Sequence, residues 1–150
     1  MTGQVISAYL HFASILALGG ILMAEWVLYR QDMTLGQARL LQRLDLHYLF
    51  AAMVALGSGL ARVVWYGKGT SYYLDNTVFW VKMGLFVAIA LLSVAPTIHY
   101  LRWTPRLKQG HPPEISDRQF RTYRRYLVAE AVLLILMPLA AVLMARGIGK

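Results

Sequence analysis

Four long apolar stretches dominate this chain and leave little freedom for its fold. They are Val5–Leu28, Tyr48–Tyr66, Val78–Leu101 and Leu127–Ala145. Each has about 20 residues, which is enough for a helix to cross roughly 30 Å of hydrocarbon. In lipid the backbone polar groups must be bonded within such a segment, so these stretches are expected to be helices. The pattern predicts an all-α integral membrane protein in which residues 1–150 form a single transmembrane domain.

The connections between these stretches are short and predict how the helices are joined. A serine or threonine followed three residues later by glutamine occurs at Thr34–Gln37 and at Ser116–Gln119. This capping box predicts that the second helix begins near residue 34 and the fourth near Asp117. Short loops favour antiparallel neighbours, so the expected architecture is an up-down-up-down four-helix bundle.

Other local patterns refine the expected bundle. The second loop, Gly67–Thr77, is turn-rich, and the prolines of the third loop are expected to keep that loop non-helical. Small residues four positions apart favour close contact between membrane helices. Such pairs are Ala13 and Ala17, Gly20 and Ala24, and Gly57 and Ala61.

The formal net charge of +8 is distributed unevenly and predicts the orientation of the chain. Ten basic residues follow the first and third apolar stretches: Arg30, Arg39, Arg43, Arg102, Arg106, Lys108, Arg118, Arg121, Arg124 and Arg125. Only three lie on the opposite side: Lys68, Arg146 and Lys150. Cytoplasmic loops carry the basic excess, so the first and third loops are expected in the cytoplasm and both termini in the periplasm. The charges flank membrane spans, and this arrangement indicates contact with membrane lipid and no nucleic-acid partner.

Three basic side chains are expected at similar depth near the outer ends of their helices. His11 lies within the first span, while Arg62 and Lys82 lie at the outer ends of the second and third spans. A buried histidine could bond a neighbouring helix, take part in a proton relay, or bind haem iron as an axial ligand. The two cations could reach the headgroups, or they could form with His11 a pocket for carboxylates such as haem propionates.

A second polar layer is expected in the inner half of the bundle, made of Glu25, Asp45, His47, His99, Arg124 and Arg125. His47 and His99 are predicted at matched depth on antiparallel neighbours, where they could hold a haem between them or simply be hydrated. Glu25 and Glu130 lie within spans, where a carboxylate is expected to pair with a basic group or to be protonated. The chain has no cysteine, which excludes disulfides, thiolate metal sites and thiol catalysis.

Several short motifs resemble those of a family of proteins. They are Leu10–His11, the G-x-x-R of Gly59–Arg62, Lys68–Gly69, the F-W-x-K of Phe79–Lys82 and the S-x-x-P-T of Ser93–Thr97. Together they resemble an uncharacterised bacterial four-helix inner-membrane family, a domain of unknown function, over nearly the whole chain.

A more distant resemblance concerns haem. His11 and the W-x-K of Trp80–Lys82 resemble the haem-containing membrane protoporphyrinogen oxidase, and copper-resistance D-type proteins look like a wider relation. In the oxidase family an early first-helix histidine binds haem and a W-x-x-K-like motif opens the third helix. The resemblance therefore implies that His11 is a haem ligand with Lys82 as its functional partner. It also implies late third-helix histidines, of which this chain has only His99.

The favoured interpretation is a haem-b-binding protein of the bacterial inner membrane with a redox or porphyrin-related role. His11 would bind the haem iron, Arg62 and Lys82 would hold its anionic groups, and His47 and His99 are candidates for an inner site. Two alternatives are a non-enzymatic accessory subunit, in a larger membrane complex or a homo-oligomer, and a small proton- or solute-conducting unit that uses Glu25 and Glu130.

Overall fold

The computed structural model of the protein describes residues 1–149. Its long helices are α1 (Thr2–Leu28), α2 (Leu35–Ala61), α4 (Thr77–Leu101) and α6 (Asp117–Ala145). A π-helical turn, η1 (Arg62–Tyr66), extends α2, and the two short helices are α3 (Thr70–Leu74) and α5 (Thr104–Lys108). Residues 1–149 contain no strand, and four helical segments are long and apolar enough to cross a membrane. The predicted all-α membrane class is confirmed.

Two of the long helices begin at the capping boxes that the sequence predicts. The Thr34 hydroxyl accepts a hydrogen bond from the Gln37 amide at 3.2 Å, and the Gln37 side chain accepts one from the Thr34 amide at 2.9 Å. Ser116 and Gln119 repeat this arrangement at the start of α6. Because these caps lie well before the apolar stretches, α2 and α6 each begin with several polar turns.

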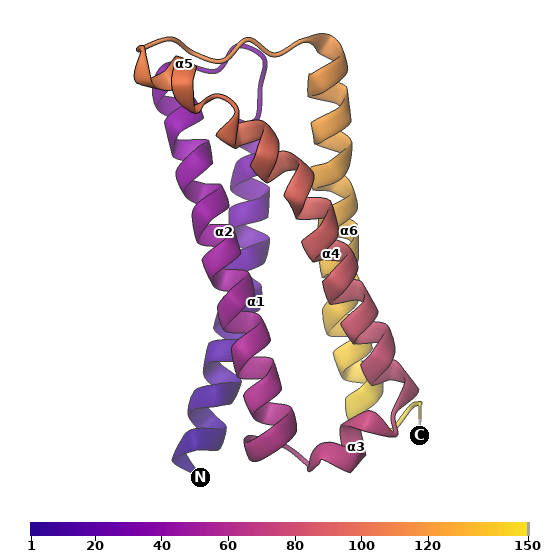
Figure 1. The fold of residues 1–150 in the computed structure, drawn as a ribbon. Helices are drawn as coiled ribbons and strands as arrows, with labels where there is room; N and C mark the ends of the chain where they lie inside the picture. Colours follow the sequence, from indigo (N-terminus) through magenta and orange to yellow (C-terminus); the bar gives the residue numbers. More distant parts are fainter. Residues whose placement is uncertain (150) are drawn as a thin grey trace.

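The long helices pack mainly as two pairs, α1 with α2 and α4 with α6. The N-terminus and the end of α6 lie at one end of the molecule together with α3, and we call this the terminal end (Figure 1). The opposite end carries the α1–α2 loop, α5 and the connection into α6, and we call it the basic end (Figure 1). Successive long helices therefore run in alternating directions in this view.

The apolar core is concentrated near the basic end. Its fully buried members include Tyr29, Leu41, Tyr100 and Leu127, which come from all four long helices or the residues next to them. Elsewhere most large apolar side chains are exposed on the outside of the helices, among them Phe12, Leu16, Phe50 and Ile135. An apolar exterior of this kind is suited to lipid, where the usual hydrophobic drive to bury apolar side chains is absent.

Two local expectations were wrong. The third loop, predicted to be non-helical, contains the short helix α5. In α5 Pro105 occupies the first turn, where its missing N–H has no intrahelical partner to lose. Gly20 and Gly57 have open space where a side chain would project, so neither brings two helices of this chain together. The pattern of small residues predicted these contacts from one helix alone, without knowing which face each helix buries.

Candidate functional site

His11 is held against the neighbouring helix α2 by its ring. Its Nδ1 atom lies 3.0 Å from the carbonyl oxygen of Ala55 and 3.3 Å from the hydroxyl of Ser58. A carbonyl oxygen can only accept, so Nδ1 carries the proton and Nε2 keeps its lone pair. No residue among 1–149 bonds Nε2. The arrangement matches that of metal-binding histidines, which commonly donate their other ring N–H to a backbone carbonyl.

Gly59 permits this close approach of the ring. A Cβ atom at residue 59 would lie 3.1 Å from Cε1 of His11 and 3.4 Å from Nδ1. The ring therefore rests on the surface of α2 where a side chain is missing, one turn beyond Ala55. This contact gives the glycine of the G-x-x-R motif a physical role.

Arg62 and Lys82 both lie within electrostatic range of the His11 ring. Arg62 is the first residue of η1, and its guanidinium lies 5.9 Å from the centre of the Phe12 ring. π-Helical turns are rare and frequently occur at functional sites. Both cations are partly buried, and neither forms an ion pair within the described residues. We call His11, Arg62 and Lys82 the terminal-end basic cluster; it draws on α1, η1 and α4.

The structure does not bring His47 and His99 together. His47 is exposed on α2, and its Nδ1 atom bonds the carbonyl oxygen of Arg43 on the same helix at 2.6 Å. His99 is buried on α4, where its Nε2 atom is hydrogen-bonded to the Tyr29 hydroxyl at 3.1 Å and its ring stacks on Tyr123 at 3.7 Å. The geometry therefore argues against an inner haem held between these two histidines. Their depth was readable from the sequence, but the direction of each side chain was not.

The partners of His99 form an aromatic cluster that sequence reasoning missed. Tyr29 is completely buried at its centre, with the rings of Tyr100, Trp103 and Phe120 within 6.3 Å. Tyr29, Tyr100 and Trp103 lie at the ends of the first and third spans and Phe120 lies before the fourth, so spacing along the chain does not reveal that they meet. Their enclosure at the basic end depends on the packing of α4 and α6 around the end of α1.

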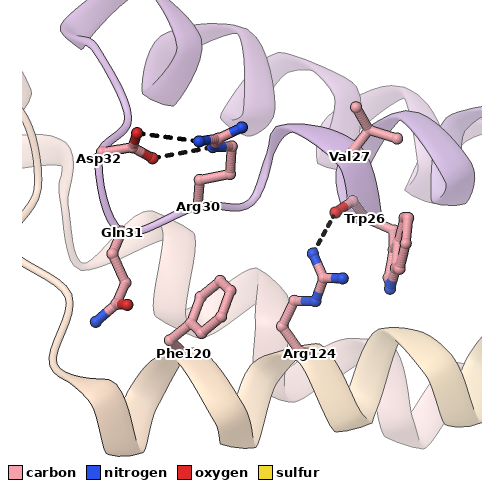
Figure 2. A pocket seen from close by; sticks show the side chains of 7 residues that line it. All are labelled: Trp26, Val27, Arg30, Gln31, Asp32, Phe120 and Arg124. Atoms are coloured by element: carbon pink, nitrogen blue, oxygen red, sulfur yellow. Dashed lines mark hydrogen bonds and ion pairs between the residues drawn. The ribbon is translucent and has the colours of Figure 1, made fainter.

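An open pocket of about 630 Å³ lies between the end of α1, the following loop and α6 (Figure 2). Its two arginines already have partners. Arg30 donates two hydrogen bonds to Asp32 at 2.9 and 3.1 Å, and this pairing lowers the pKa of the Asp32 carboxyl. Arg124 donates to the carbonyl oxygen of Trp26 at 3.0 Å and lies over that ring. The pocket therefore offers no unpaired cation to an anionic ligand.

The carboxyl groups of Glu25 and Glu130 are buried in the basic half of the bundle. The sequence allowed either a basic partner or protonation for such a group. Neither carboxyl forms an ion pair with any residue from 1 to 149.

Apolar helices of spanning length, with buried polar side chains between them, define a helical integral membrane protein. Residues 3–149 match the model of a family described as "Predicted membrane protein (DUF2214)", and the chain belongs to that family. Searches of curated proteins and of solved structures found no match.

Proposed function

We propose that this protein binds haem b at the terminal-end basic cluster, with His11 as an axial ligand of the iron. The supporting observation is the hydrogen bond from Nδ1 of His11 to the Ala55 carbonyl oxygen. It fixes the tautomer that leaves the Nε2 lone pair available, and neutral imidazole is a common haem ligand. Bound haem b would supply one-electron redox chemistry.

The cations of the cluster suit the anionic groups of such a cofactor. Arg62 and Lys82 have no acidic partner in the described residues and lie near His11, so both are available to haem propionates. Charge-assisted hydrogen bonds of this kind are stronger than neutral ones. We assign no second axial ligand, because His47 is exposed and His99 is bonded to Tyr29.

We further place the protein in the inner membrane of a bacterium, with the basic end in the cytoplasm. This orientation rests on the excess of arginine and lysine in the first and third loops.

An absorption spectrum of the purified full-length protein tests the haem proposal directly. After expression with ample haem supply, we expect a reducible b-type spectrum in detergent. His11→Ala should abolish or strongly weaken it. His111→Ala is the matched control, because that histidine is exposed in a loop at the opposite end and should leave the spectrum unchanged. A colourless wild-type protein, or a spectrum that survives His11→Ala, would show that the proposal is wrong.

A further inference from the structure

Buried oxygen atoms from all four long helices meet in the basic half of the bundle. We call this group the buried carboxyl layer. Its members are Glu25 of α1, Asp45 and Tyr48 of α2, Thr97 and Tyr100 of α4, and Glu130 of α6. The carboxyl groups and the two tyrosines lie within electrostatic range of one another.

Each long helix contributes one buried oxygen that makes no close hydrogen bond, although the Tyr48 hydroxyl and the Glu130 carboxyl are near enough to interact with each other. These atoms are Oε1 of Glu25, the Tyr48 hydroxyl, the Tyr100 hydroxyl and Oε1 of Glu130. The four side chains are 2%, 5%, 0% and 1% exposed, respectively. A buried polar group without a good partner is destabilising, so these oxygens require hydrogen-bond donors or acceptors beyond those that ionised carboxylates supply. The Tyr100 hydroxyl makes this point independently of the carboxyl groups.

Asp45 differs from the two glutamates. The Thr97 hydroxyl donates a hydrogen bond to its Oδ1 atom at 2.8 Å. A donor of this kind favours the ionised form of a carboxyl group. Asp45 is therefore the member best suited to hold a negative charge, whereas Glu130 has only the neighbouring Tyr48 hydroxyl and Glu25 has no donor among the described residues.

No cation of the described chain balances this layer. Two arginines at the basic end of α1 and α6 are engaged elsewhere: Arg30 with Asp32, and Arg124 with the Trp26 carbonyl and ring. His99 is bonded to Tyr29 and stacked on Tyr123. Three ionised carboxylates in this position would be strongly unfavourable, because a membrane interior solvates charge poorly and like charges repel.

We propose that the buried carboxyl layer is a proton-binding site, in which Glu25 and Glu130 hold exchangeable protons at neutral pH. A protonated carboxyl both donates and accepts, so it can satisfy the tyrosine oxygens either directly after a small movement or through water. A single divalent metal ion would leave one of the three negative charges of ionised Glu25, Asp45 and Glu130 uncompensated. In addition, no three histidine or acidic side chains among residues 1–149 are placed to hold a metal. The site does not involve His11 and stands whether or not haem is bound.

Infrared difference spectroscopy of the full chain tests this proposal. The protein is purified in dodecyl maltoside, which has no carbonyl group, and spectra are recorded from neutral to alkaline pH. We expect a carboxylic-acid carbonyl band at neutral pH that shifts in D₂O and disappears at alkaline pH. Glu25→Gln and Glu130→Gln should each remove part of this band, and the double variant most of it. Glutamine matches the shape of a neutral glutamate, and gel filtration and circular dichroism check that the variants fold.

Two substitutions serve as controls. Asp75→Asn, at an exposed aspartate of the terminal end, should leave the band unchanged, and Asp45→Asn should leave most of it. Absence of the band from the wild-type protein would overturn the proposal without any variant. A band that survives the double substitution would overturn it as well. Replacing choline chloride by sodium chloride should have no effect, and loss of the band in sodium would identify a sodium site instead.

Discussion

The contact between His11 and Gly59 makes a quantitative prediction about stability. In Gly59→Ala the new Cβ atom would lie 3.1 Å from Cε1 of His11. This is a few tenths of an ångström closer than the usual carbon–carbon contact of about 3.5–4.0 Å. To relieve the overlap the ring must move away from α2, and the 3.0 Å bond from Nδ1 to the Ala55 carbonyl oxygen then lengthens toward the limit of a hydrogen bond.

Loss of that bond should cost about 1 kcal/mol. Replacing glycine by alanine inside a helix gains roughly 1 kcal/mol in a soluble host, so the net effect of Gly59→Ala is difficult to interpret alone. Gly57→Ala provides the matched control, since it lies two residues away on the same helix with open space around its Cβ position. Both variants gain the same free energy from replacing glycine by alanine in a helix, so this gain cancels when they are compared. Gly59→Ala should therefore be less stable than Gly57→Ala by about 1 kcal/mol.

Equilibrium unfolding in mixed detergent and SDS micelles, followed by circular dichroism, measures this difference. The same pair of substitutions is then made in a His11→Ala background, where no ring remains to be displaced. The difference between the two glycine variants should disappear there, as expected when two residues interact directly. Equal stability of the two variants in the wild-type background, or a difference that persists without His11, would refute the reasoning.

Two further predictions concern orientation and the basic cluster. A reporter enzyme that works only in the periplasm should be active when fused after Lys150, and one that works only in the cytoplasm should be inactive there. The reason is that ten of the fifteen basic residues follow the first and third spans, which places those connections in the cytoplasm. The opposite result would reverse the assigned orientation. Arg62→Lys and Lys82→Arg should each lower haem affinity roughly tenfold or more, a loss of about 1.5–3 kcal/mol, because a guanidinium fork and an ammonium bind a carboxylate differently. Lys108→Arg, at an exposed residue of α5, is the control and should leave haem affinity unchanged. If both cluster variants bind haem as tightly as the wild type, Arg62 and Lys82 do not hold its carboxylates and instead contact the lipid headgroups.

The helices of this protein and their class follow from local sequence. Lipid requires each apolar stretch to bond its own backbone, so length and composition were enough to predict four spanning helices. The starts of α2 and α6 were also predictable, because Thr34–Gln37 and Ser116–Gln119 satisfy the first amide groups within one turn of chain. The presence of His11, Arg62 and Lys82 near one end of the bundle was inferred from depth alone.

The sites depend on contacts between residues distant in the chain, and these required the tertiary structure. His11 bonds a carbonyl oxygen 44 residues away, and His99 bonds a hydroxyl 70 residues away. Depth in the membrane follows from position along a helix, whereas the direction of a side chain depends on the rotation of that helix against its neighbours. The sequence therefore placed His47 and His99 at one level, and packing turned one outward and buried the other. The depth of Glu25 and Asp45 was likewise readable from the sequence, but only packing buried their carboxyl groups together with that of Glu130.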